Sequence, residues 1–201
     1  MGKIYCLMGK SASGKDTIYK MVLEKMDERI KTIIPYTTRP IRSGENEGVE
    51  YHFVSVPDFK KMEAEGKVIE SRCYHTVHGD WYYFTANDGQ IDLSAYDYLL
   101  IMTPEGCASL KKHFGDDAVR PLYIYVETGL RLQRAVERER KQSSPKYAEL
   151  CRRFLADEED FSENILSKLN IWEKYENNDI ETCVGKILSD LKDSTDMRLQ
   201  E

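Results

Sequence analysis

One stretch near the N-terminus decides the fold, and it reads Gly9-Lys10-Ser11-Ala12-Ser13-Gly14-Lys15-Asp16-Thr17. The apolar residues 4–8 precede it, and the amphipathic residues 17–29 follow it. A strand, a glycine-bounded loop and a helix in this order predict a phosphate-binding loop. The glycines let successive backbone N–H groups converge on phosphate oxygens, and the positive end of the helix strengthens the attraction. An ordinary Gly/Ser turn is the alternative, and the flanking patterns argue against it.

Three side chains of this stretch have separate expected tasks. Lys15 reaches the outer phosphates as a point charge. Asp16 stands where a Ser or Thr hydroxyl normally contacts Mg²⁺, and a hydroxyl appears only at Thr17. Asp16 and Thr17 are therefore the candidate Mg²⁺ ligands.

The composition is that of an ordinary globular protein. The chain has 201 residues, of which 41% are hydrophobic and 32% charged, which suits one domain with insertions. A net charge of −6 argues against nucleic acid as a partner. The N-terminus does not resemble a signal peptide, and no apolar run approaches the roughly 20 residues that span a bilayer. We therefore expect small-molecule substrates and no membrane partner.

The five cysteines are widely scattered along the chain and form no C-x-x-C pair. Reduced, buried structural thiols in a cytoplasmic protein are the expected state. His75 and His78 have a spacing that suits a metal site. With no further ligand evident near them, we interpret both as loop residues.

Strands and helices alternate along most of the chain, which predicts a parallel α/β sheet. Strands are expected at 31–35, 98–103 and 121–126, with helices at 104–114, from 129 onward, at 146–168 and at 180–191. The pattern changes between 35 and 87, where short β segments at 51–56, 67–74 and 81–85 surround a helix at 57–65. This segment is expected to be an insertion that faces the carboxyl ends of the strands, where ligands bind.

A second group of polar residues lies in this insertion. Arg39 and Arg42 are three residues apart on a loop stiffened by Pro40, so both can converge on one phosphate. A solvated basic turn is the alternative. Downstream, Glu70 ends an apolar strand, and residues 82–85 add phenol and hydroxyl groups.

In this order and spacing, the motifs resemble those of the guanylate kinase family over nearly the whole chain. They are the phosphate loop, T-T-R-P-x-R-x-G-E at 37–45, G-x-E-Y-x-F at 48–53, I-E at 69–70, Y-x-T at 83–85, an arginine-rich segment and a late Asn. The resemblance implies a P-loop NTPase fold with a central parallel sheet, a GMP-binding insertion and a helical lid. It divides the single domain 1–201 into a core (1–34, 88–130 and 154–201), an insertion (35–87) and a lid (131–153).

The resemblance also implies an acceptor site. By motif position, the residues that hold the GMP phosphate are Arg39, Arg42, Tyr51 and Tyr83. Glu70 matches the carboxylate that reads guanine, and Thr85 matches a hydroxyl near the base. A carboxylate suits guanine because it accepts from both the ring N–H and the amino group, a donor pair that adenine lacks. Thr103 stands at a family position for an acidic residue near the guanine.

On the donor side, the resemblance implies ATP as co-substrate and Mg²⁺ as cofactor. ATP would bind to residues 9–17 of the phosphate loop, with Asn177 near the adenine. The expected catalytic charges are those of Lys15, Arg39 and the lid arginines Arg134, Arg138 and Arg153. A solvated helix with Arg–Glu pairs is the alternative for the lid segment.

Four residues depart from the family pattern, namely Asp16, Pro35, Phe84 and Thr103. Asp16 has a precedent in the related ribose bisphosphate kinases, which carry G-K-D in the same loop. The leading hypothesis is an ATP-dependent kinase that makes GDP from GMP. A kinase acting on a phosphorylated sugar or another phosphorylated acceptor is the second hypothesis. An inactive, peptide-binding module is the third, and intact Gly9, Gly14 and Lys15 argue against it.

Overall fold

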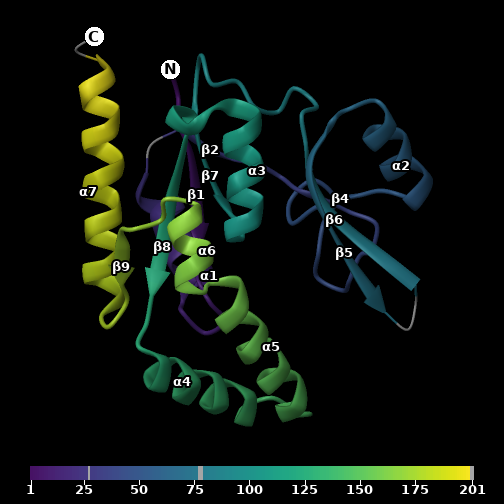
Figure 1. Ribbon diagram of the computed structural model, residues 1–201, viewed down its shortest axis with the longest axis vertical. Coiled ribbons are helices and arrows are strands. Elements are labelled where there is room, and N and C mark those ends of the chain that lie inside the picture. The colour runs from purple at the N-terminus through teal and green to yellow at the C-terminus, as the bar shows by residue number, and fades with distance from the viewer. Residues whose placement is uncertain (27, 77–78, 200–201) are drawn as a thin grey trace.

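The computed structural model describes residues 1–26, 28–76 and 79–199, and its centre is a five-stranded parallel sheet (Figure 1). The strand order is β2-β7-β1-β8-β9. The strands are β1 (Ile4–Met8), β2 (Ile30–Thr32), β7 (Asp97–Ile101), β8 (Val119–Tyr125) and β9 (Lys174–Glu176). The parallel α/β sheet expected from the alternating pattern is confirmed.

Strand β1 lies in the middle of the sheet and is buried on both faces. Ile4, Cys6 and Met8 join one apolar cluster, which α3 (Pro104–Phe114) and α6 (Glu163–Lys168) cover. Tyr5 and Leu7 join the other, which α1 (Lys15–Lys25) and α7 (Ile180–Leu199) cover. This burial explains why the strand is an uninterrupted apolar run rather than an alternating one. The phosphate loop follows directly from it.

The insertion forms a second sheet of four strands in the order β4-β3-β6-β5, beside the core in Figure 1. These are β3 (Tyr36–Thr37), β4 (His52–Phe53), β5 (Val68–Thr76) and β6 (Gly79–Ala86). Helix α2 (Val56–Ala64) packs Phe59 against Phe84 and Tyr82 on one face of this sheet. The opposite face carries three of the expected acceptor residues, Glu70, Tyr83 and Thr85.

The β5–β6 pairing contains an irregularity that sets which residues share a face. Its register shifts between Val68 and Glu70. Beyond the shift, Glu70 lies opposite Thr85 and Arg72 opposite Tyr83. Because side chains alternate along a strand, these residues share one face, and the residues between them point to the α2 side.

The segment expected to be the lid, 131–153, falls in two helices that pack against each other at one end of the molecule, α4 (Thr128–Arg140) and α5 (Tyr147–Asp160), and in the loop between them (Figure 1). Between α3 and β8 lies a short 3₁₀ helix, Asp116–Ala118. Within the described residues, no helix is both long and apolar enough to cross a bilayer.

Several predicted element boundaries were wrong. The single helix predicted at 146–168 is two helices, because Ser162 is extended and Phe161 turns to stack on Tyr123. Helix α1 begins at Lys15 rather than at residue 17. The strand predicted at 31–35 ends at residue 32, and only His52–Phe53 of the predicted 51–56 is a strand. Strand β9 was not predicted.

The cysteine prediction holds in part. All five cysteines are free thiols. Cys6, Cys107 and Cys183 are buried, as expected for structural residues, but Cys73 and Cys151 are exposed.

Candidate active site

The phosphate loop has two positions that only glycine fits. Gly14 has a positive φ of 84° as the N-cap of α1, and a Cβ there would lie 2.5 Å from Nδ2 of Asn177. At Gly9, a Cβ would lie 2.6 Å from Oγ of Ser13 and 2.9 Å from the carbonyl oxygen of Ile124. Both clashes involve a packed neighbour, so any side chain at either position would displace the loop.

Asn177 supports this loop from the end of β9. Its side chain is buried, and Nδ2 donates to the carbonyl of Ser13 at 2.7 Å. Nη1 of Arg134 donates to the backbone carbonyl of Asn177 at 3.1 Å. The structure therefore connects the loop to the first lid arginine through Asn177, while contact of Asn177 with adenine stays a prediction.

The two candidate Mg²⁺ ligands lie together in the first turn of α1. The Asp16 side chain is 71% exposed, and its carboxylate lies 3.1 Å from Nζ of Lys15. Thr17 is also exposed. An accessible carboxylate and hydroxyl fit Mg²⁺, because this ion prefers oxygen ligands and completes its shell with water and substrate phosphates.

Two acidic residues of α5 bind donor groups of the phosphate loop. Oδ2 of Asp157 accepts from the backbone N–H of Ser11 at 2.8 Å. Oε2 of Glu158 lies 2.6 Å from Nζ of Lys10. Lys10 and Ser11 were predicted to bind ATP phosphates, and here both bind carboxylates of α5.

These carboxylates are held in turn by Arg131 of α4, which the sequence analysis missed. Its side chain is only 1% exposed, and its guanidinium lies 3.9 Å from the centre of the Phe154 ring. The guanidinium donates to the Ser11 carbonyl at 3.3 Å, to Oδ2 of Asp157 at 3.4 Å and to Oε1 of Glu158. Its position one turn before Arg134 on an amphipathic helix was a signal that it faces inward.

The three predicted lid arginines lie in different surroundings. Arg134 is half-buried at Asn177. Arg138, one turn further along α4, is exposed. Arg153 is exposed on α5, with Nε 3.6 Å from Glu149. The structure therefore places Arg134 beside Asn177, the residue that supports the phosphate loop. The ATP contacts of Arg138 and Arg153 stay predictions.

On the insertion, the structure brings Arg39, Tyr51 and Tyr83 together. Arg39 is 4% exposed, and its guanidinium carbon lies 5.1 Å from the centre of the Tyr51 ring. The Tyr51 and Tyr83 rings meet edge to face at 5.6 Å. Nη1 and Nη2 of Arg39 donate to the two carboxylate oxygens of Glu45 at 2.7 and 2.6 Å. This bidentate pair fixes the plane of the guanidinium.

Glu45 is a second residue to which the sequence analysis gave no role, although it belongs to the quoted motif. Hydrogen bonds from Arg39 lower the pKa of Glu45 to about 2. The backbone N–H of Arg42 also donates to Glu45, at 2.9 Å, whereas the Arg42 residue is exposed. One carboxylate thus orders the turn that carries both predicted phosphate ligands.

Glu70 and Thr85 form a pair on the same face. The Thr85 hydroxyl donates to Oε1 of Glu70 at 2.8 Å. Burial raises the pKa of Glu70, and the Thr85 hydrogen bond opposes part of that rise. Phe84, which departs from the family pattern, is buried on the α2 side against Phe59. Its side chain therefore lies on the face opposite Glu70.

Thr103 has a structural task at the end of β7. It is the N-cap of α3, and Oγ1 accepts from the backbone N–H of Gly106 at 3.2 Å. An N-cap hydroxyl of this kind stabilises a helix by about 1 kcal/mol. Contact of Thr103 with an acceptor stays a prediction.

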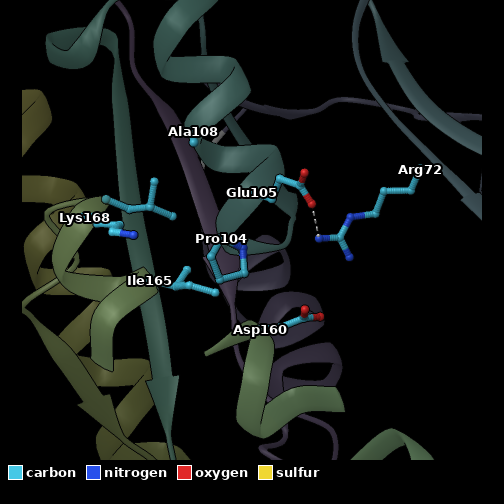
Figure 2. Close-up of a pocket in the computed structure, with 8 residues that line it drawn as sticks. Arg72, Pro104, Glu105, Ala108, Asp160, Ile165 and Lys168 are labelled. Carbon is cyan, nitrogen blue, oxygen red and sulfur yellow. Dashed lines mark hydrogen bonds and ion pairs between the residues drawn. The ribbon is translucent and has the colours of Figure 1, made fainter. Parts of the chain in front are cut away.

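A pocket of about 310 Å³ lies beside this helix, where the insertion meets the core (Figure 2). Arg72 of β5 reaches across it to Glu105 of α3 at 3.2 Å, and Ile165 of α6 lies on the far side. No predicted site residue lines it. The Glu105 side chain is 81% exposed, so this ion pair contributes little stability.

The parallel sheet, the glycine-bounded loop after its central strand and an insertion carrying buried basic and aromatic residues define a P-loop nucleotide-kinase fold. The family profile described as guanylate kinase matches residues 1–191. A guanylate kinase of Sphingopyxis alaskensis is 30% identical over 95% of this chain and 82% of its own length. One of Chlorobaculum tepidum is 29% identical over 84% of this chain and 75% of its own. This chain belongs to the guanylate kinase family.

A solved structure agrees with this fold. The crystal structure of guanylate kinase from Anaplasma phagocytophilum superposes with a TM-score of 0.66 at 20% identity. The match covers 96% of this chain and 86% of that one. The resemblance noted in the sequence and the expected P-loop NTPase fold are both confirmed.

Proposed function

We propose that this chain transfers the γ-phosphoryl group of ATP to GMP, giving ADP and GDP. One observation carries the proposal beyond family membership. The insertion presents a buried, oriented Arg39 with Tyr51 and Tyr83 on the same side as the Glu70–Thr85 pair. A phosphate-binding group and a guanine-reading carboxylate are thus available to one nucleotide.

In the proposed reaction, a phosphate oxygen of GMP attacks the γ-phosphorus as its bond to the bridging oxygen of ADP breaks. This transfer needs positioning and charge neutralisation rather than a covalent enzyme intermediate. Lys15 and the backbone of the phosphate loop hold the donor, and Arg134, Arg138 and Arg153 supply further positive charge. Asp16 and Thr17 would hold Mg²⁺, which neutralises phosphate charge when bound.

Arg39 has to exchange partners during acceptor binding. Both Nη atoms are bound to Glu45 in the described structure. A phosphate can accept the same two parallel hydrogen bonds with a greater negative charge. Glu45 therefore keeps Arg39 in the binding geometry until the acceptor phosphate arrives, which reduces the entropy lost on binding.

A second candidate is transfer to a phosphorylated sugar. The observation in its favour is that Asp16 and Thr103 both differ from the residues that the guanylate kinase family carries at these positions. Asp16 places an exposed carboxylate in the loop, and Thr103 caps α3 where the family carries an acidic residue. This candidate leaves the half-buried Glu70 without a base to read, so we rank it second.

An acceptor panel tests the proposal. Each of GMP, dGMP, AMP, UMP, CMP and ribose 1-phosphate, 5-phosphate and 1,5-bisphosphate is offered with ATP and Mg²⁺, and ADP formation is measured. We expect GMP to give the highest kcat/KM. In Glu70→Gln the preference for GMP over AMP should fall, because the amide offers one acceptor oxygen and a donor NH₂.

The matched control is Glu63→Gln on α2, where the carboxylate is exposed and pairs with Lys60. This variant should keep the wild-type preference. If GMP is inert and a sugar phosphate is phosphorylated, the second candidate is correct.

A further inference from the structure

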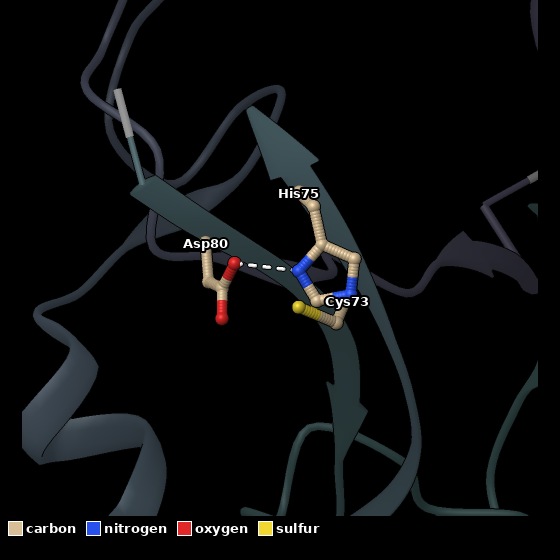
Figure 3. Close-up of side chains that lie close together, drawn as sticks. All are labelled: Cys73, His75 and Asp80. Atoms are coloured by element: carbon tan, nitrogen blue, oxygen red, sulfur yellow. Dashed lines mark hydrogen bonds and ion pairs between the residues drawn. The ribbon is translucent and has the colours of Figure 1, made fainter. Parts of the chain in front are cut away.

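Three potential metal ligands converge on the β5–β6 hairpin, away from the site described above. Cys73 and His75 are two residues apart on β5, so they share a face. Asp80 of β6 lies directly opposite His75 in the antiparallel register. Figure 3 shows the thiol, the imidazole and the carboxylate gathered together.

The spacing of their donor atoms suits one ion. One ligand atom from each residue lies within 4.8 Å of the other two. Nδ1 of His75 is 2.7 Å from Oδ1 of Asp80. Tetrahedral Zn²⁺, with bonds of about 2.0–2.3 Å, places its ligand atoms about 3.3–3.7 Å apart. All three side chains are exposed, so they have room to rotate toward this geometry as the His75–Asp80 hydrogen bond opens.

We propose that Cys73, His75 and Asp80 form a surface site for Zn²⁺, with a fourth position taken by water. The ligand types select the metal, because a thiolate and an imidazole favour Zn²⁺, whereas Mg²⁺ and Ca²⁺ favour oxygen. All three residues are exposed, so a hydrated ion reaches them without any opening of the fold.

The hairpin itself keeps the ligands in register. Oγ1 of Thr76 donates to the carbonyl of Gly79 at 2.8 Å, immediately beside the His75–Asp80 pair. The β-ladder continues on the other side, where Cys73 lies opposite Tyr82. Ligands fixed by paired strands lose less conformational entropy on binding than ligands on a loose loop.

This site is separate from the proposed acceptor site, although both use β5. Glu70 and Arg72 alternate with Cys73 and His75 along the strand, so the two sets point to opposite faces. A cation at the hairpin therefore has no need to displace a nucleotide. Zinc binding and phosphoryl transfer can be measured independently.

The structure revises two expectations from the sequence. His75 was interpreted as a loop residue with no further metal ligand nearby. It lies instead within β5, beside two other potential ligands, Cys73 and Asp80. Cys73 was expected to be buried and is exposed. His78 lies outside the described residues. The third ligand, Asp80, could be identified only from the pairing of the two strands.

The test is calorimetric titration of the full chain with Zn²⁺ in the presence of a phosphine reductant that keeps the thiols reduced. A parallel titration with Co²⁺ provides a spectroscopic probe of the ligands. We expect one ion per chain, a thiolate-to-Co²⁺ charge-transfer band, and retention of Zn²⁺ in excess Mg²⁺. Cys73→Ser should abolish the band. Cys73→Ser and His75→Asn should each weaken Zn²⁺ binding by about 100-fold or more. Loss of a residue that only hydrogen-bonds to a metal ligand already weakens metal affinity by about 10–100-fold.

Matched controls are available for both ligand types. Cys151→Ser removes the other exposed cysteine, and His113→Asn removes an exposed histidine of α3. Both should bind Zn²⁺ as the wild type does. Unchanged affinity in Cys73→Ser or His75→Asn would overturn the proposal. One ion per two chains would also overturn it, because the metal would then bridge two copies.

Discussion

Replacement of Arg131 by Met should destabilise the protein substantially, although no sequence motif assigns this residue a task. Met retains much of the apolar volume against Phe154 but removes the guanidinium. Asp157 and Glu158 then lose the cation that both of them contact. The Ser11 carbonyl also loses a donor.

The size of the effect follows from the burial of the partners. Removal of one member of a fully buried ion pair costs about 3–5 kcal/mol. The Asp157 side chain is 17% exposed, but that of Glu158 is 39% exposed and keeps Lys10 at 2.6 Å. This exposure places the loss of unfolding free energy near the lower limit, at about 3 kcal/mol.

Thermal unfolding followed by circular dichroism measures this loss. A domain of this size loses about 2–4 °C of Tm per kcal/mol, so Arg131→Met should melt about 6–12 °C below the wild type. Arg131→Lys keeps a charge without the planar fork and should fall between the two. Arg140→Ala, an exposed residue on the same helix, should change stability by less than about 0.5 kcal/mol. A Tm of Arg131→Met within about 2 °C of the wild type would refute the reasoning.

Three further predictions concern the reaction. Lys15→Ala should lower kcat by about 100-fold or more while leaving the circular dichroism melt unchanged, and near-wild-type turnover would contradict the loop assignment. Asp16→Ser should keep ATP affinity but shift the Mg²⁺ concentration that gives half the maximal rate. An identical Mg²⁺ titration would leave Thr17 as the better ligand. Because burial raises the pKa of Glu70, kcat/KM for GMP should fall with decreasing pH from a higher pH than an ordinary glutamate would give. In Glu70→Gln, the part of the pH dependence that comes from protonation of Glu70 should be absent. Titration of the GMP phosphate affects both proteins alike. Superimposable pH profiles would show that Glu70 does not bind GMP as a carboxylate.

The parts of the fold that were predictable are those in which local pattern and tertiary packing agree. Residues 104–114 were predicted as a helix and form α3 without any difference in bounds. Pro104 at its start and Gly115 at its end are local signals, and they need no information from the rest of the chain. The phosphate loop was predictable for the same reason.

The errors arise where distant residues decide the local structure. The break between α5 and α6 depends on Phe161 stacking on Tyr123, thirty-eight positions earlier in the chain. Strand β9 has three residues, too few for a period to be visible, and exists because it pairs with β8.

The same limit applies to the candidate site. Arg39, Tyr51 and Tyr83 were identified from motifs, and the structure brings them together. Arg131 and its carboxylate partners belong to two helices whose contact no local pattern reveals. The amphipathic pattern of α4 indicates that Arg131 faces inward, but its carboxylate partners can be identified only after the helices are packed.

The register shift between Val68 and Glu70 determines which chemistry each side of β5 presents. A strand turns over completely when its register moves by one residue. If Ile69 paired regularly with Thr85, the rest of β5 would slip by one residue, so Cys73 and His75 would point toward the nucleotide side and Glu70 and Arg72 toward α2. The one extra residue thus decides that the base-reading surface, rather than the thiol–imidazole surface, lies on the nucleotide side of the strand.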